Sequence, residues 1–227
     1  MRRSATSRDL NPGITNRIDD SFSSHSSVAH RSQRQAGPSR RPDADGRPRQ
    51  SSARIAALAD HIKIEPLNSR RLALEPLKVT HAPEMATILG DPSLYAFIGG
   101  SPMTLAQVKS LYQRLEGGSP DPCETWLNWV LRSRDQSALV GTIQVTVWPD
   151  RSRAEIAWIV GAAWQGRGIA TEAAAQVVQW LRRRGIRLVI AHIHPDHGAS
   201  QAVARHIGLT PTTTVVDGEV EWEVELA

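Results

Sequence analysis

From about residue 62 onward, apolar and polar residues follow regular patterns that predict strands and helices. The run from Arg71 to Leu77 alternates apolar and polar side chains, as a half-buried strand does. A short helix is expected over Thr80–Leu89 and a second from Thr104 to about Glu116. The second helix opens with Thr104-Leu-Ala-Gln107, which has the form of a capping box. Its apolar residues share one helical face: Leu105, Val108, Leu111, Tyr112 and Leu115.

The remainder of the chain switches between strand-like and helix-like patterns. Three strands separated by polar turns are predicted over Thr125–Leu131, Leu139–Trp148 and Ala154–Val160. The elements expected after them are a long helix over Thr171–Arg184, a buried strand over Arg187–Ile193, a short helix over Ala199–Ile207 and a hairpin that turns at Asp217-Gly218. This order predicts the α/β class, with a mixed, mostly antiparallel sheet flanked by helices in one domain spanning residues 62–227.

The first 60 residues differ in composition from the rest. Residues 1–60 contain eleven Arg and six Asp but no Lys or Glu, and their apolar residues follow no period. Such a segment buries too little apolar surface to offset its ordering entropy, so we expect a disordered tail rich in Arg, Ser and Pro. The tail carries a net charge of +5 and the following residues carry −1, so the basic character of the chain belongs to the tail.

The composition also bears on partners and location. An arginine-rich tail can contact nucleic acid or anionic surfaces. The sequence favours instead a solvated extension, or upstream translation from a wrongly assigned start. Aromatic residues do not interleave its arginines, as stacking on bases requires, so nucleic acid is not an expected partner. No apolar run reaches the roughly 20 residues of a membrane span, and no signal-peptide core is present, so no membrane partner is expected. The single cysteine, Cys123, cannot form an internal disulfide, which favours a cytoplasmic location.

A glycine-containing loop joins the predicted strand Ala154–Val160 to the long helix. Gly166 and Gly168 lie directly before the helix, whose first turn has N–H groups without partners and the positive end of the helix dipole. These groups form a seat for phosphate oxygens, and glycine lets a diphosphate approach the backbone closely. The sequence therefore predicts a phosphate-binding loop.

Two common phosphate-binding loops do not fit this segment. A P-loop requires a Gly-Lys-Ser/Thr sequence, and no lysine is present. A dinucleotide fingerprint requires a third glycine and an acidic residue about 20 positions later, and both are missing, which disfavours a nicotinamide-dependent oxidoreductase. The pattern Gln-x-x-Gly-x-Ala, from Gln165 to Ala170, instead resembles the acyl-CoA loop of the GNAT superfamily of N-acyltransferases.

Further segments of residues 70–227 resemble the same superfamily in the same order. The opening strand from Arg71 is similar to that of the branch containing ribosomal-protein N-terminal acetyltransferases. The other matching segments are Gly141-Thr-Ile143, Ala154-Glu-Ile-Ala-Trp158, Pro195-Asp-His-Gly-Ala-Ser200 and His206-Ile-Gly-Leu209. The chain departs from the family pattern at His197, where Asn is usual, and at Leu209, where Phe is usual.

The resemblance implies acetyl-CoA as the acyl donor, with no metal, and an amine as the acceptor. Main-chain groups of the strand end Ile159-Val160-Gly161 are implied to contact the pantetheine arm, and an N–H near Val160 to stabilise the developing oxyanion. The diphosphate is implied to bind the amides of Gln165, Gly166, Arg167, Gly168, Ile169, Ala170 and Thr171. The Arg167 side chain either adds a charged contact or is a solvated loop residue.

Catalytic residues are less constrained by the sequence. Glu155 occupies a position that is acidic in the N-terminal acetyltransferase branch, so it is either the general base or a structural anchor within the sheet. Many superfamily members use a tyrosine on the last helix to protonate the thiolate, and here that position is Ala204. Ser200 is the nearest substitute, although it could instead cap the helix. His197 is expected to contact the cofactor.

A metal site is not expected at the histidine group formed by His192, His194 and His197, because neither cysteines nor an acidic cluster accompany it. The predicted function is transfer of an acetyl group from acetyl-CoA to a primary amine, of either a protein N-terminus or a small molecule. The alternative is a catalytically silent CoA-binding module that acts through a partner. The sequence leaves the acceptor identity and the oligomeric state open.

Overall fold

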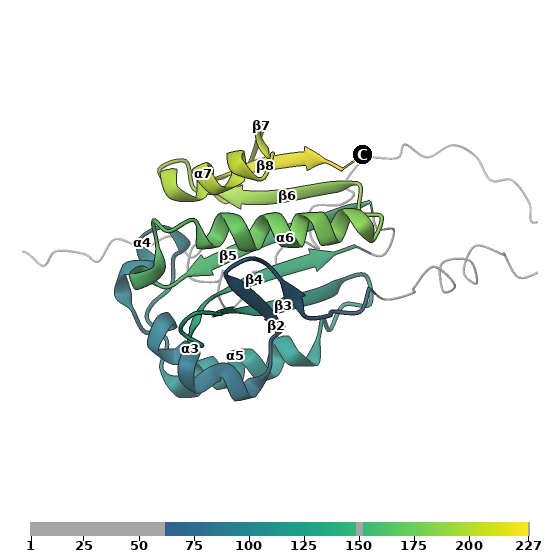
Figure 1. The fold of residues 1–227 in the computed structure, drawn as a ribbon. Coiled ribbons are helices and arrows are strands. Elements are labelled where there is room, and N and C mark those ends of the chain that lie inside the picture. The colour runs from purple at the N-terminus through teal and green to yellow at the C-terminus, as the bar shows by residue number, and fades with distance from the viewer. Residues whose placement is uncertain (1–61, 149–151, 227) are drawn as a thin grey trace, which may run out of the picture.

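The described residues, 62–148 and 152–226 of this computed structural model, place eight strands in one sheet (Figure 1). The strands are β1 (Leu67–Asn68), β2 (Leu72–Pro76), β3 (Thr125–Ser133), β4 (Leu139–Val147), β5 (Arg153–Val160), β6 (Leu188–Ile193), β7 (Thr210–Val216) and β8 (Glu219–Glu225). Their order across the sheet is β1-β2-β3-β4-β5-β6-β8-β7. Each neighbouring pair is antiparallel except β5 and β6, which are parallel. The predicted mixed, mostly antiparallel sheet is confirmed.

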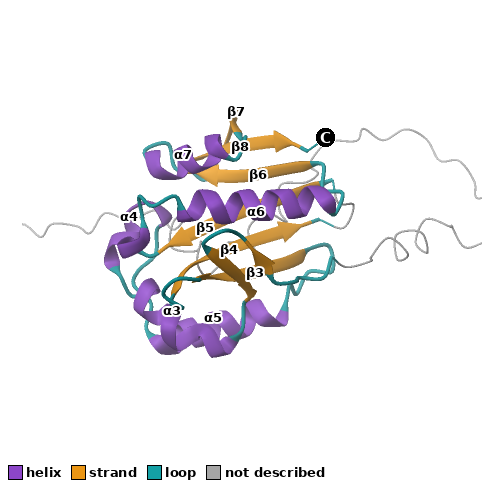
Figure 2. Ribbon diagram, viewed as in Figure 1, coloured by secondary structure: helices purple, strands orange, loops and turns teal. Residues whose placement is uncertain are grey.

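Helices cover both faces of this sheet, and Figure 2 shows them against the strands. The longer ones are α3 (Ala82–Leu89), α5 (Leu105–Gly117), α6 (Ile169–Arg183) and α7 (Gly198–His206). Successive residues of a strand point to opposite faces, which separates the two layers. On β3, Trp129 and Leu131 pack with residues of α6, whereas Val130 packs with residues of α3 and α5. Helices α6 and α7 therefore lie on one face, and α3 and α5 lie on the other.

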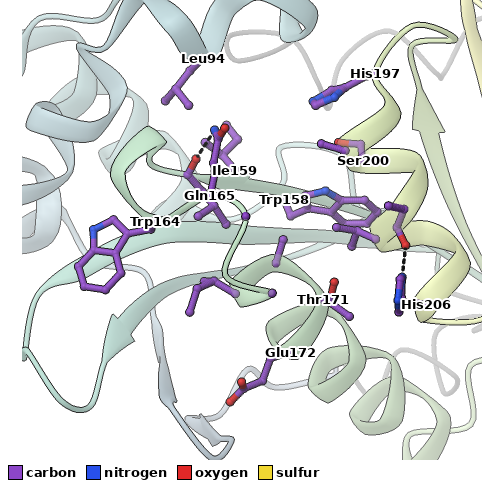
Figure 3. Close-up of a pocket in the computed structure, with 18 residues that line it drawn as sticks. Leu94, Trp158, Ile159, Trp164, Gln165, Thr171, Glu172, His197, Ser200 and His206 are labelled. Atoms are coloured by element: carbon purple, nitrogen blue, oxygen red, sulfur yellow. Dashed lines mark hydrogen bonds between the residues drawn. The ribbon is translucent and has the colours of Figure 1, made fainter.

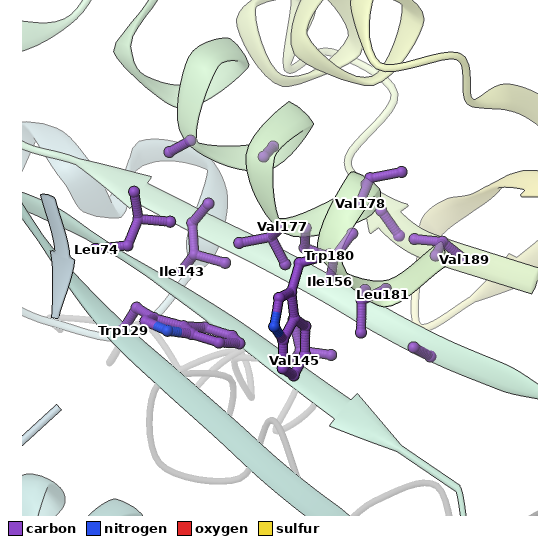
Figure 4. Packing of buried hydrophobic residues seen from close by; sticks show 14 of the residues in the cluster. Leu74, Trp129, Ile143, Val145, Ile156, Val177, Val178, Trp180, Leu181 and Val189 are labelled. Carbon is purple, nitrogen blue, oxygen red and sulfur yellow. The ribbon is translucent and has the colours of Figure 1, made fainter. Parts of the chain in front are cut away.

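The core under α6 fixes the position of this helix and of the loop before it. Trp180 of α6 and Trp129 of β3 are both buried and meet edge to face, with ring centroids 5.5 Å apart (Figure 4). Such a pair contributes about 1 kcal/mol beyond the burial of its area. Val177 and Leu181 of α6 are fully buried in the same cluster. Ile169, the first residue of α6, is buried in the same cluster, so the start of the helix is also packed against the sheet.

The parallel strands β5 and β6 remain paired only at their first residues. Arg153, Ala154 and Glu155 have partners on β6, the last pair being Glu155 with Ile190. From there β5 stays paired with β4 as far as Val160, while β6 stays paired with β8 as far as Ile193. We call the divergence of the two strands beyond Glu155 the fork. It leaves main-chain groups of the last residues of β5 without a β6 partner among the described residues.

Several element boundaries follow the expected local chemistry. The capping box before α5 is confirmed, since the Thr104 side chain accepts from the Gln107 N–H and the Gln107 side chain accepts from the Thr104 N–H. Helix α6 begins at Ile169, two residues earlier than Thr171, because Gly168 adopts a left-handed conformation (φ 71°) and ends the loop. The hairpin prediction at Asp217-Gly218 is confirmed, with φ of 51° and 82°.

Two small elements were not predicted. Strand β1 has only two residues, and its strand conformation depends on pairing with β2. Helix α4 (Tyr95–Ile98) is a single turn, too short for a periodic pattern. The predicted disordered tail over residues 1–60 lies outside the described residues, as does most of the predicted turn at 149–153.

Candidate functional site

A cavity of about 610 Å³ lies on the α6 face, at the open end of the fork (Figure 3). The end of β5, the glycine-containing loop, the first turn of α6 and one face of α7 surround it. Its volume is within the range of small-molecule sites. We call it the α6 cavity. The predicted residues that line it are Ile159, Val160, Gln165, Gly166, Gly168, Ile169, Ala170, Thr171, His197 and Ser200.

The last residues of β5 point main-chain groups into the fork. The Gly161 N–H donates to the Val140 carbonyl of β4 at 2.9 Å, so Ile159, two residues earlier, also turns its polar groups toward β4. Val160 and Trp158, which alternate with these residues along the chain, turn theirs the other way. The Gln165 side-chain amide donates to the Val160 carbonyl at 3.0 Å. The Val160 N–H is then the donor that this strand end offers to a ligand.

The loop and the helix start provide a second group of donors. Gly166 and Gly168 have φ values of 70° and 71°, a conformation in which residues with a side chain are strained. A Cβ on Gly166 would meet no atom within 4 Å, so the space beside this loop is open to a ligand. The first helical N–H with a partner belongs to Glu172 and donates to the Gly168 carbonyl at 3.0 Å. The N–H groups of residues 169–171 precede it, in the first turn of the helix, which is a position that suits an anion.

Some expected contacts are placed differently. The Gln165 N–H donates to the Ala162 carbonyl at 3.2 Å, so this amide is engaged within the loop and Gln165 contributes through its side chain. The Arg167 guanidinium lies over the Trp164 ring, 5.3 Å from its centroid, and Arg167 is not among the residues lining the α6 cavity. Gly161 faces away from the cavity, because a Cβ there would touch Ile88 of α3 at 3.3 Å. Ile169 places its side chain in the core, which leaves only its backbone for a ligand.

His197 lines the α6 cavity and also contacts α4. The His197 ring stacks on Phe97 of α4 with centroids 4.5 Å apart, and the His194 ring lies 6.0 Å from the same Phe97. Burial lowers the pKa of His197, and the charge of His194 lowers it further. His197 is therefore biased toward the neutral form at pH 7. The contact of His197 with Phe97 was not predicted, because α4 is too short to show a periodic pattern.

Helix α7 presents one face to the cavity. Ser200 lines it, whereas Ala204 is fully buried in the core. His206 also lines the cavity, beside Thr171 in Figure 3, and the sequence analysis had not identified it as a site residue. Its Nδ1 donates to the Ala202 carbonyl at 2.6 Å, which leaves Nε2 available. The helical spacing of positions 199, 203 and 206 was the signal that could have found it.

Glu155 lies on the other face of the sheet, at the base of the fork. It is on the same side of β5 as Ile159, which packs against the α3 and α5 cluster, and it does not line the α6 cavity. A Glu155 carboxylate oxygen lies 2.8 Å from His192 Nδ1 on β6. Glu221 of β8 is 3.7 Å from His192 Nε2. The side chains of Glu155, His192 and Glu221 are 20%, 5% and 18% exposed, so this acid–histidine–acid row is largely shielded from water.

Two further observations concern other ligands and the membrane. In the described residues, no three side chains of the metal-binding types His, Cys, Asp and Glu gather closely enough to hold a metal ion. Within the same residues, the helices lack the length and apolar character needed to cross a bilayer.

Comparisons with known proteins identify the family of the chain and its fold. A family profile described as an acetyltransferase (GNAT) domain matches residues 71–210. A search of curated proteins finds no match. Several solved structures share the fold at low sequence identity. A GCN5-related N-acetyltransferase from Brucella melitensis has a TM-score of 0.61 and 20% identity, covering 72% of this chain and 80% of that chain.

Two similar structures contain the cofactor. RimL, described as a ribosomal L7/L12 alpha-N-protein acetyltransferase in complex with coenzyme A, has a TM-score of 0.59 and 18% identity, covering 71% of this chain and 98% of that chain. The microcin C7 self-immunity acetyltransferase MccE, in complex with acetyl-CoA and AMP, has a TM-score of 0.56 and 15% identity, covering 69% and 93%. Because the acetyltransferase profile covers more than half of the sequence, the chain belongs to the GNAT acetyltransferase family and is an acetyl-CoA-dependent acyltransferase.

Proposed function

We propose that this protein transfers the acetyl group of acetyl-CoA directly to the primary amine of an acceptor, either a protein N-terminus or a small molecule. One observation carries the proposal: the fork of β5 and β6 opens beside a helix start with free N–H groups, and both border the same α6 cavity. A strand edge suits the amide-rich pantetheine arm, and the helix start suits the diphosphate.

The donor is held mainly by the backbone. The N–H groups of residues 169–171 and the open space beside Gly166 receive the diphosphate. The exposed edge of β5 at Trp158 and Val160 receives the pantetheine. His206 and Ser200 of α7 close the cavity on the opposite side. This arrangement brings the thioester to the end of β5, where the Val160 N–H donates to the carbonyl oxygen as negative charge develops on it.

The amine reaches the thioester through the fork from the face that carries Glu155. Glu155 accepts the proton of the attacking amine, directly or through water, as the C–N bond forms and the C–S bond breaks. His192, held between Glu155 and Glu221, fixes the orientation of the Glu155 carboxylate. The thiolate receives a proton through the Ser200 hydroxyl or a water beside it, and that group takes a replacement proton from solvent. An α-amine, with a pKa of about 8, is partly neutral near pH 7 and needs less help than a lysine, with a pKa of about 10.4.

An amine acceptor is supported only by the kinds of side chain found at the base of the fork. The described side chains beside the base of the fork are carboxylates and an imidazole, which suit a protonated or hydrogen-bonding amine. RimL acts on a ribosomal protein by its description, but at 18% identity this likeness concerns the fold.

The test is a turnover assay of the full chain with acetyl-CoA against a panel of peptides with free N-termini, polyamines and amino sugars, combined with calorimetry of coenzyme A binding. We expect coenzyme A binding and release of free thiol with at least one amine class. Binding without turnover on every class would favour the silent CoA-binding module. Failure to bind coenzyme A at millimolar excess would remove the proposal entirely.

A further inference from the structure

We propose that Arg71, directly before β2, is a positioning residue for the diphosphate loop, because it neutralises a carboxylate at the helix start and holds the loop backbone. The inference rests on the proposed binding of acetyl-CoA at this loop. Arg71 links two segments that lie 101 residues apart in the sequence: the opening of β2 and the Thr171-Glu172 pair that follows the glycines.

The Glu172 carboxylate is bound from the β1–β2 turn by three donors. One of its oxygens accepts from the Ser69 hydroxyl at 2.7 Å and from the Arg71 backbone N–H at 2.8 Å. The other oxygen accepts from Arg71 Nε at 2.6 Å. Charge-assisted bonds of this kind are shorter and stronger than neutral ones. The start of α6 is thereby attached to the edge of the sheet.

The same guanidinium also contacts the loop before the helix. Arg71 Nη1 donates to the Arg167 carbonyl at 2.8 Å. A second guanidinium nitrogen lies 3.6 Å from the position of a Cβ on Gly168. Arg71 therefore contacts the chain on both sides of Gly168, the residue in the left-handed conformation. It binds the Arg167 carbonyl before this glycine and the Glu172 carboxylate after it. The planar fork of Arg provides both contacts at once, which a lysine cannot do.

The charge of Glu172 makes this contact functionally important. Glu172 is in the first turn of α6 and lines the α6 cavity, beside the N–H groups that receive a diphosphate. A carboxylate there suits the helix dipole but repels an anionic ligand. Burial raises the pKa of Glu172, but the hydrogen bonds from Arg71 and Ser69 and the charge of Arg71 outweigh it, so the pKa is lowered overall. The carboxylate stays ionised, and Arg71 compensates its charge.

A purely structural role would predict other consequences. If the Arg71–Glu172 pair only attached β2 to α6, its loss would impair every acyl donor alike, through a looser cavity. If it compensates charge beside the diphosphate, its loss would impair only donors that carry a diphosphate. A donor without this group, S-acetylpantetheine, separates the two roles.

The experiment compares KM values of the full-length wild type and Arg71→Gln for acetyl-CoA and for S-acetylpantetheine. We expect KM for acetyl-CoA to rise about tenfold, the effect of losing one charge-assisted contact, with little change for S-acetylpantetheine. Arg71→Lys should fall between the two proteins, because it keeps the charge and loses the second contact. Equal losses for both donors, or no loss for either, would overturn the proposal.

Substitution of the carboxylate gives a second, independent test. Glu172→Gln removes the negative charge and leaves Arg71 on the Arg167 carbonyl, so KM for acetyl-CoA should stay equal or fall. The double variant Arg71→Gln/Glu172→Gln should recover most of the affinity lost in Arg71→Gln. An increased KM in Glu172→Gln would contradict the charge role even if Arg71→Gln fails to fold.

A matched control is available on β3. Arg132 binds Glu75 through two nitrogens, at 2.7 and 3.3 Å, and does not line the α6 cavity. Arg132→Gln should leave KM for acetyl-CoA unchanged. Failure of the proposed function itself would look different, because the wild type would then neither bind coenzyme A nor use either donor.

Discussion

On the α6 side of the fork, the proposed binding of acetyl-CoA relies mostly on the backbone: the Val160 N–H, the N–H groups of residues 169–171 and the open space beside Gly166. On the other side, three neighbouring strands contribute side chains, Glu155, His192 and Glu221. The first side depends on backbone conformation and the second on residue identity. Substitutions should therefore impair the two sides by different routes, one through geometry and the other through chemistry.

The largest effect is expected on the side-chain face. Glu155→Gln removes the proposed proton acceptor and should lower kcat about 100-fold or more. Its affinity for coenzyme A, measured by calorimetry, should stay unchanged, because Glu155 does not line the α6 cavity. Glu223→Gln is the control. Glu223 lies on β8, as Glu221 does, pairs with Ile190 of β6 and has no proposed role. Wild-type rates in Glu155→Gln would mean that Glu155 is only a structural partner of His192.

On the α6 side of the fork, a methyl group at Gly141 of β4 should displace the end of β5. A Cβ there would overlap the Ile159 carbonyl oxygen and lie 3.0 Å from the Val160 Cα, so the end of β5 must shift. We expect Gly141→Ala to lower the free energy of unfolding by about 2 kcal/mol and to impair turnover strongly. Urea unfolding and kcat/KM measure the two effects.

Gly117, the last residue of α5, provides the control for this substitution. A Cβ on Gly117 would meet nothing within 4 Å. Gly117→Ala should be neutral or slightly stabilising. If Gly141→Ala were equally neutral, the strand end would be more adaptable than its packing indicates.

A smaller effect on the same side is expected at Gly166. Gly166→Ala places a side chain at a φ of 70° but meets no atom within 4 Å, so it should cost about 1 kcal/mol of stability. The new methyl group would also stand where the diphosphate approaches, so KM for acetyl-CoA should rise several-fold more than that strain accounts for. Gly185→Ala has the same strain (φ 81°) at the far end of α6 and should leave KM unchanged. Similar KM changes in both variants would argue against a ligand beside Gly166.

The smallest effect concerns His197 at the cavity mouth. Its pKa is lowered in the folded protein, so the unfolded chain takes up the proton first as the pH falls. The free energy of unfolding should therefore decrease below about pH 6.5, until the pH passes the folded pKa.

His197→Asn tests this contribution by thermal unfolding at pH 7.5 and pH 5.5. The variant should lose less stability between the two pH values than the wild type does. The comparison with the wild type is needed because burial also lowers the pKa of His81, which shifts stability in the same direction. An identical loss in both proteins would exclude His197 as a contributor.

Elements governed by local chemistry were predicted well. The capping box at Thr104, the hairpin at Asp217-Gly218 and the glycines before α6 depend on hydrogen bonds or dihedral angles within a few residues. Their patterns are therefore visible in the sequence. The single turn of α4 and the two-residue β1 were missed because so few residues carry no period, and their conformations depend on neighbours elsewhere in the chain.

The sequence by itself determined the order of the longer strands and helices, the position of the glycine-containing loop before α6 and the family resemblance. Only the tertiary structure decided where the fork begins, that Arg71 reaches Glu172 and Arg167, that His206 faces the α6 cavity and that Glu155 pairs with His192. The physical reason is the distance along the chain. Capping, turn and periodicity signals act within one or two turns, whereas partners 37 and 101 residues apart meet only after the sheet has brought their strands and helices together.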